Sequence, residues 1–173
     1  KKINPGLIYA SGTGYGPLGP DSAKPSLDGC GQARSGLMMS ATQHSQTEPS
    51  YVAGAVSDQM GGIVLCLGVI SALYSREQTG VGQRVDVSHL SSTMWLQGLA
   101  VSMQLLSGYH YRSTDRKNPL NPLVNAYECQ DGRWIQFMSA QFQRYWPDFA
   151  TALGISDLID DPIVGDIKGM AAG

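Results

Sequence analysis

The chain has 173 residues, of which 42% are hydrophobic and 15% charged, enough for one substantial core or for one domain and part of another. The formal net charge is −2 and there is no run of lysine or arginine, so we expect no nucleic-acid partner and no binding to an anionic membrane surface. The N-terminal residues include Pro5 and have no apolar signal-peptide region, which favours a cytoplasmic protein.

Potential metal ligands are scattered along the chain. The sequence contains no C-x-x-C pair and no histidine pair at metal-ligand spacing, so we expect reduced thiols, no metal site and no permanently bound cofactor. The residues concerned are Cys30, Cys66, Cys129, His44, His89 and His110.

The first predicted element is a strand over residues 7–11, followed by a loop over 12–31 that is rich in Gly, Pro and Ser. Gly14, Gly16 and Gly19 in this loop fit G-x-G-x-x-G, a pattern typical of dinucleotide-binding turns. Such a turn must open a helix, because the N-terminal amides of that helix hold the pyrophosphate. Prolines follow here instead, so we interpret the stretch as a wide loop leaving a strand end.

Two helices are predicted next. The first runs from about Gly31 to Met39, with an apolar side formed by Ala33, Leu37 and Met38. The second occupies residues 57–80 and is apolar on nearly every face, which predicts burial inside the molecule or in a subunit interface. Polar residues and glycines interrupt its apolar stretch, so we expect it to fall short of a membrane span.

Residues 84–88 alternate as a strand with one polar face, and residues 89–107 predict another helix. The order strand, helix, helix, strand, helix favours an open α/β layer fold. The expected core positions of the last helix are Leu90, Met94, Leu96, Leu99, Met103 and Leu106.

The composition changes after residue 111. Residues 1–111 form one predicted domain, residues 112–123 a polar linker, and residues 124–173 the beginning of a smaller α+β unit. Two short strands, 124–129 and 133–139, flank an Asp-Gly turn and predict a hairpin. A helix with an aromatic side follows, and no element is predicted for the last eight residues. The residues on that helix are Tyr145, Trp146, Phe149 and Leu153.

Four stretches resemble the family III CoA-transferases, a group that includes formyl-CoA and carnitine-type CoA-transferases and α-methylacyl-CoA racemases. They are residues 4–16, 27–38, 57–88 and 125–137, and the string R-E-x-T-G-x-G-Q-x-V-D-V-S at 76–88 is the most specific. The resemblance implies part of a doubly wound, Rossmann-like large domain followed by the start of a small α+β domain. It also implies a homodimer of interlocked chains. The chain covers well under half of the family's length, and the half that holds much of the CoA nucleotide is expected to lie outside it.

The resemblance implies an acyl-CoA:carboxylate CoA-transferase that works through an aspartyl-CoA thioester, with coenzyme A as a substrate. It assigns the nucleophile to Asp58. From the sequence alone, Ser57 and Asp58 at a helix start are typical of an N-cap. The two interpretations are compatible, because Ser57 can cap the helix while Asp58 reacts, and a helix N-terminus stabilises a carboxylate.

Four further residues are candidates through the same resemblance. Asp28 aligns with an acidic residue of the family's active-site loop, and its alternative is an Asx-turn. Tyr15 and Gln32 are expected near the CoA site, with a packed tyrosine and a polar helix-start residue as their alternatives. Leu27 stands where the racemases carry a proton-transferring histidine, and leucine cannot move a proton.

Two alternatives to the transferase remain. One is a racemase or other isomerase of the same superfamily, which Leu27 disfavours. The other is a non-catalytic assembly fragment of a larger enzyme, and we expect the isolated chain to be inactive. Residues 112–123 lack the glycine-rich lid of the formyl-type enzymes, so formyl or oxalate specificity is not expected.

Overall fold

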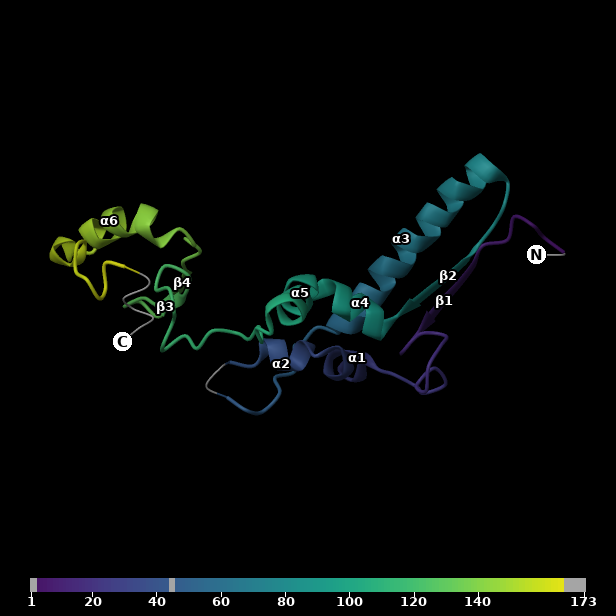
Figure 1. The fold of residues 1–173 in the computed structure, drawn as a ribbon, viewed down its shortest axis with the longest axis horizontal. Helices are drawn as coiled ribbons and strands as arrows, with labels where there is room; N and C mark the ends of the chain where they lie inside the picture. The colour runs from purple at the N-terminus through teal and green to yellow at the C-terminus, as the bar shows by residue number, and fades with distance from the viewer. Residues whose placement is uncertain (1–2, 44–45, 167–173) are drawn as a thin grey trace. The chain divides into compact units, whose positions relative to one another are not determined.

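The computed structural model describes residues 3–43 and 46–166, and it divides into two compact units at Ser113 and Thr114, within the predicted linker (Figure 1). His44 and residues 167–173 lie outside the described ranges, and with them most of the tail for which no element is predicted. The first unit contains β1 (Tyr9–Thr13), α1 (Asp28–Ser35), α2 (Leu37–Ala41), α3 (Val56–Thr79), β2 (Arg84–Ser88), α4 (His89–Leu96) and α5 (Gly98–Ser107). The second unit contains β3 (Ala126–Glu128), β4 (Trp134–Gln136), α6 (Phe142–Ala152) and a 3-10 helix (Ser156–Leu158).

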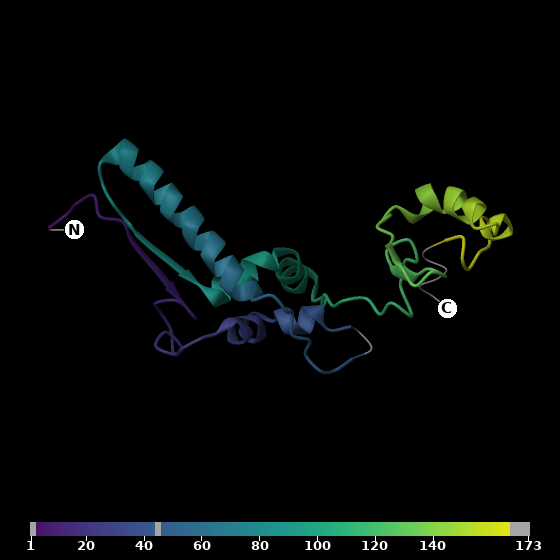
Figure 2. The same ribbon diagram turned by 180° about the vertical axis from the view of Figure 1, so that it is seen from behind.

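The first unit is built on two parallel strands. β1 pairs with β2 in a register that places Tyr9 opposite Arg84 and Thr13 opposite Ser88. The long helix α3 lies alongside both strands (Figures 1 and 2). Parallel strands linked through a helix are the α/β arrangement that the sequence predicts. The carboxyl ends of the two strands meet at one edge, which is where open α/β folds place their ligands.

Two predicted helices are each divided in two. The helix predicted from Gly31 to Met39 begins earlier and is interrupted at Gly36, which has a left-handed φ of 84°. The helix predicted for residues 89–107 is interrupted at Gln97, whose side-chain amide donates to the carbonyl oxygens of Ser35 and Thr93. Predictions of single helices were wrong here, because a left-handed glycine and a tertiary hydrogen bond outweigh local helix propensity.

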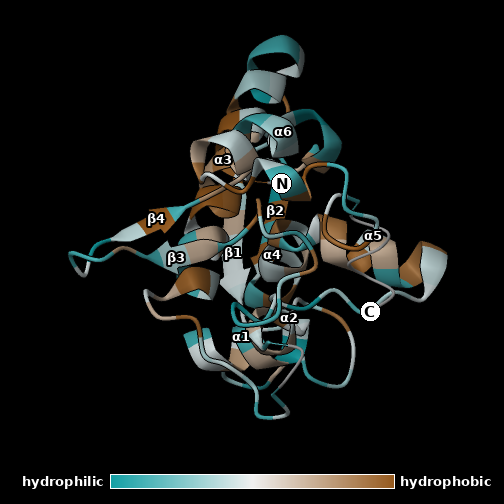
Figure 3. Cartoon of the chain, turned by 90° about the vertical axis from the view of Figure 1, so that its left-hand side faces the viewer, coloured by the Kyte–Doolittle hydropathy of each residue, from teal (hydrophilic) through white to brown (hydrophobic). Residues whose placement is uncertain are grey.

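The interior of the first unit is mostly polar. Helices α1, α3 and α4 pack against one another through small hydrogen-bonded side chains, as where Thr93 Oγ1 donates to Ser57 Oγ at 2.8 Å. The core predicted for α4 and α5 was therefore wrong: no residue of α5 is buried, and Leu99 and Leu106 are exposed. The hydropathy colouring in Figure 3 shows that much of α5 is hydrophobic. The buried polar residues of this unit are Asp28, Gln32, Thr42, Ser57, Ser88, Ser92, Thr93 and Gln97.

Helix α3 is less buried than its sequence predicts. Only Ser57 and Ala72 are buried, whereas Ile63, Leu67 and Ile70 are each exposed by more than half. The expectation of burial is wrong within this chain, because the strands and α1 and α4 cover only part of the helix surface. The expectation that this segment falls short of a membrane span was wrong, because α3 is long and apolar enough to cross a membrane. This result rests on length and composition alone, and core helices of soluble proteins meet the same two criteria.

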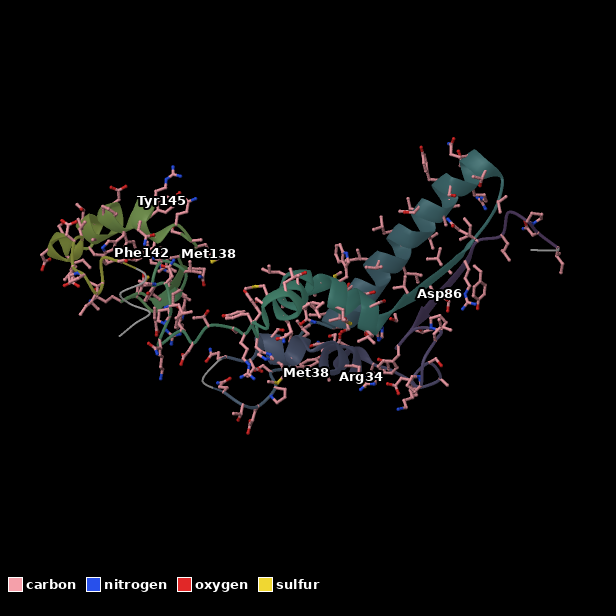
Figure 4. All side chains as sticks on the ribbon, in the orientation of Figure 1. Arg34, Met38, Asp86, Met138, Phe142 and Tyr145 are labelled. Carbon is pink, nitrogen blue, oxygen red and sulfur yellow. The ribbon has the colours of Figure 1, made fainter. Side chains whose placement is uncertain are left out.

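The second unit is a short hairpin with one helix. β3 and β4 pair antiparallel, with Ala126 opposite Gln136, and Gly132 in the turn has a φ of 78°. Its core contains two stacked rings, Phe142 and Trp146, whose centroids are 5.1 Å apart; Figure 4 labels the first of them on α6. Strands and helix occur in the predicted order, although each strand is shorter than predicted because only three residues pair.

Candidate functional site

A hollow of about 300 Å³ lies at the carboxyl ends of β1 and β2. Its walls are the two strand ends, the first turns of α3 and the start of α4, and they include Asp58, Ser26 and His89. The hollow therefore lies at the edge of the sheet where ligands bind in open α/β folds.

Asp58 is the one predicted site residue that lines this hollow. It lies in the first turn of α3, and its side chain is 50% exposed. Asp58 Oδ1 is 3.3 Å from His89 Nε2. A carboxylate in the first turn of a helix lies near the positive end of the helix dipole. The site thus presents a half-exposed carboxylate to the hollow.

The prediction that Ser57 caps α3 was wrong. The helix begins at Val56, and its N-cap, Ala55, has a left-handed φ of 53° and provides no side-chain cap. The carboxylate of Asp28 takes the capping role from another helix. Its Oδ1 accepts from the backbone N–H of Ser57 at 2.7 Å and of Asp58 at 3.4 Å.

Asp28 contacts the N-terminus of α3 but does not line the hollow. It is buried, and its Oδ2 accepts from Gln32 Nε2 at 2.7 Å and from the hydroxyl of Tyr51 at 2.8 Å. Burial raises the pKa of Asp28, but hydrogen bonds from Tyr51, Ser57, Gln32 and Asp58 outweigh burial, so the pKa lies below its ordinary value. Asp28 is therefore an ionised carboxylate that fixes the backbone of Asp58.

The other three predicted residues also lie outside the lining of the hollow. Gln32 is fully buried. Its Nε2 donates to Asp28 Oδ2 and to the carbonyl oxygen of Val52, and its Oε1 accepts from the N–H of Val52. Leu27 is the exposed N-cap residue of α1, and Tyr15 is half-buried in the loop after β1. The structure thus gives Gln32 a packing role next to Asp28.

His89 and Ser26 are functional candidates that the sequence analysis did not identify. His89 contacts Asp58 through one ring nitrogen, and its Nδ1 is 3.3 Å from Ser26 Oγ. The sequence carries one signal for His89, namely its position directly after the predicted strand 84–88. A polar residue at the carboxyl end of a parallel strand is placed to face a ligand. Ser26, inside a long loop, carries no such signal.

The glycine-rich loop after β1 is a sequence of turns, as predicted, and the next helix begins only at Asp28. Gly16 and Gly19 have left-handed φ values of 92° and 91°. Gly14 is needed for a different reason, because a Cβ at this position would collide with the side chain of Ser26. The loop therefore brings Ser26 to the hollow.

Over residues 3–43 and 46–166, no three His, Cys, Asp or Glu side chains are grouped as ligands for a metal ion. The three cysteines are free and exposed. The polar side chains that line the hollow are those of Asp58, His89, Thr13, Ser26 and Ser88.

Residues 1–172 match the family model described as CoA-transferase family III. The chain is 30% identical to an (R)-2-hydroxy-4-methylpentanoate CoA-transferase from Clostridioides difficile, over 96% of this chain and 41% of that protein. It is 33% identical to an acetyl-CoA:oxalate CoA-transferase from Acetobacter aceti, over 93% of this chain and 41% of that protein. A crystal structure of a CAIB/BAIF family protein from Brucella suis superposes with a TM-score of 0.79 and 26% identity, covering 99% of this chain and 46% of that one. The chain thus spans less than half the length of these relatives.

Proposed function

The chain belongs to CoA-transferase family III, and on that premise we propose that it contributes the nucleophile of an acyl-CoA:carboxylate CoA-transferase. The observation that supports this proposal is the carboxylate of Asp58, half-exposed in the first turn of α3 at the wall of the hollow. The substrates are an acyl-CoA and a free carboxylic acid, and coenzyme A is carried from one acid to the other.

The reaction divides into four acyl transfers. First, a carboxylate oxygen of Asp58 attacks the thioester carbon, the C–S bond breaks, and CoA thiolate leaves behind a mixed anhydride. The thiolate then attacks Cγ of Asp58, which releases the donor acid and forms an aspartyl-CoA thioester. The acceptor carboxylate attacks that same carbon and frees the thiolate again. Finally, the thiolate attacks the acceptor's acyl carbon, giving the new acyl-CoA and the free Asp58 carboxylate.

The surroundings of Asp58 suit this role. A carboxylate attacks through its ionised form, and Asp58 lies in the first turn of α3, near the positive end of the helix dipole. Gly62, one turn along α3, has open space where a side chain would stand, so a thioester can approach closely. No step of the exchange consumes a proton, which agrees with a site built on one carboxylate.

The racemase alternative finds no support in this geometry. Racemisation needs two proton-transfer groups on opposite faces of an α-carbon. Asp58 and His89 contact each other at 3.3 Å and so offer their protons from the same side, and Leu27 is apolar and exposed. The transferase is therefore the proposed activity, and a non-catalytic assembly role is the alternative that the test below separates from it.

The remaining proposals carry the expectations from the sequence forward. The family resemblance favours a homodimer of interlocked chains. The charge and cysteine pattern favour a cytoplasmic enzyme without a nucleic-acid or membrane partner and without a permanently bound cofactor. The curated relatives differ in the acids they are named for, so the acid pair of this protein is assigned only as carboxylic acids.

Asp58→Asn tests the proposal in the intact enzyme that contains this chain. Incubation of the wild type with acyl-CoA and hydroxylamine is expected to leave a hydroxamate at Asp58, detected by peptide mass spectrometry. The variant is expected to fold, because this side chain is half-exposed and asparagine has nearly the same volume. It should form no hydroxamate, and transfer should fall by on the order of 10³-fold or more.

Asp86→Asn is the matched control, because Asp86 lies on β2 outside the hollow and pairs with Arg84. This control should retain both trapping and transfer. Near-normal turnover by Asp58→Asn would overturn the assignment and leave the assembly role.

A further inference from the structure

His89 is held between two partners that come from different segments. It is the first residue of α4, directly after β2. Its Nε2 is 3.3 Å from Asp58 Oδ1 on α3, and its Nδ1 is 3.3 Å from Ser26 Oγ in the loop before α1. Both ring nitrogens therefore have a polar partner, and one of these partners is the proposed nucleophile.

Two glycines leave room for the side chain of His89. A Cβ at Gly31 would lie 2.9 Å from the Cβ of His89, and a Cβ at Gly61 would lie 3.3 Å from its Cδ2. Only a glycine leaves the necessary space at the first of these positions. The side chain of His89 is 23% exposed, so it is shielded while its partner Asp58 remains accessible.

Because of Ser26, the imidazole of His89 can carry a proton on Nε2 whether the ring is neutral or positively charged. A hydroxyl group has one proton, and Ser26 Oγ is 3.3 Å from both His89 Nδ1 and the carbonyl oxygen of Leu27. If Ser26 donates to Nδ1, the neutral ring carries its proton on Nε2. If Ser26 donates to Leu27, it accepts from Nδ1–H of the charged ring. In both arrangements the proton is on Nε2, the ring nitrogen that lies 3.3 Å from Asp58 Oδ1.

We propose that His89 is a positioning residue whose Nε2–H holds Oδ1 of Asp58, so that Oδ2 is the oxygen that attacks the thioester. The inference rests on the proposed nucleophilic role of Asp58. Holding one oxygen orients the other, and orientation contributes strongly to the rate of an attack within a complex. When thiolate later adds to Cγ of Asp58, negative charge develops on Oδ1, and the same N–H donates to that oxygen.

A pair of amide substitutions separates this role from packing. In glutamine the side-chain nitrogen is as many bonds from Cα as His Nε2, so His89→Gln retains a donor towards Asp58. In His89→Asn the amide is one bond shorter and reaches only as far as Nδ1. Both variants replace the ring with a neutral amide, and the two amides differ in how far they reach.

The measurements are kcat, KM for acyl-CoA and hydroxylamine trapping in the intact enzyme. We expect His89→Asn and His89→Ala to lose on the order of 10²-fold in kcat, the usual effect of removing one such donor. KM should change little, because the N–H contacts the nucleophile and not CoA. His89→Gln should recover most of the lost kcat, and slow trapping at Asp58 should persist in all three variants.

Equal losses in His89→Gln and His89→Asn, with thermal unfolding unchanged, would overturn the positioning role. So would wild-type kcat in His89→Ala. These outcomes are distinct from a failure of the proposed function, which would appear as turnover in Asp58→Asn.

Discussion

The carboxylate of Asp28 accepts the backbone N–H groups that the start of α3 leaves unpaired. It does so from a buried position, with Tyr51 and Gln32 donating to its second oxygen. One of the two N–H groups belongs to Asp58. At the scale of single residues, Asp28 therefore acts on the site by fixing the backbone of the proposed nucleophile.

Asp28→Asn is expected to destabilise the fold by about 1–3 kcal/mol at pH 7, because an amide cannot accept from all four donors. The folded-state pKa of Asp28 is lowered, so its stabilisation is complete above the unfolded value of about 3.9 and is lost as pH falls towards the folded pKa. The variant should therefore show a smaller loss of stability in acid. Urea unfolding from pH 7 to pH 2.5 measures both effects.

Asp86→Asn serves as the comparison here too, because Asp86 is in an exposed pair on β2. Its removal should change stability by less than about 1 kcal/mol. An Asp28→Asn protein with wild-type stability at every pH would contradict the role of Asp28 as a cap.

The helices of the first unit fit together through a close approach at Gly31. A Cβ at this position of α1 would lie 2.8 Å from the Cβ of Ser57 on α3 and 2.9 Å from the Cβ of His89 on α4. Real Cβ atoms do not approach so closely, so any larger residue must separate the three helices. This contact therefore sets the spacing of the elements that carry the site.

Gly31→Ala is expected to cost about 1–3 kcal/mol of stability through overpacking. Gly62→Ala is the matched control, because no atom lies within 4 Å of a Cβ at that position and alanine is favoured in helices by about 1 kcal/mol. The thermal unfolding temperature should fall for Gly31→Ala and rise slightly for Gly62→Ala. Equal shifts in both would show that the close approach at Gly31 has no energetic consequence.

The elements that could be predicted from the sequence are those set by a local pattern of residues. The strand at 84–88, the helix ending at Gly80 and the hairpin turn at Gly132 follow from alternation, apolar content and glycine stops, and all three are present. The interruptions at Gly36 and Gln97 and the capping of α3 by Asp28 depend on contacts between distant segments. A single sequence does not encode those contacts as a local pattern, and the same holds for the approach of His89 to Asp58.

The whole chain spans less than half of its relatives' length and leaves a large apolar surface uncovered. The exposed residues on α3 include Ile63, Leu67 and Ile70, and α5 adds Leu99 and Leu106. Contiguous apolar surface of this kind favours association. Both helices belong to the first unit.

Residues 1–173 produced alone are expected to self-associate. Replacing Ile63, Leu67 and Ile70 with lysine or glutamate should shift the population towards monomer, because charge on this face opposes its burial. Light scattering with size-exclusion chromatography measures the mass of each form. A clean, stable monomer of the unsubstituted chain would contradict the prediction.

The parallel pairing of β1 with β2 has a consequence for how the site comes into being during folding. Thr13 and Val87 lie 74 positions apart in the chain, and Ser26 and His89 lie 63 apart. Closing loops of this length costs conformational entropy before any contact is made, and pairings of this kind form slowly. Helix α3 is local and can form early, carrying Asp58 with it. The proposed nucleophile is thus in place from the first stages, whereas His89 joins it only when the sheet closes. The hollow is therefore expected to be among the last features of the first unit to form.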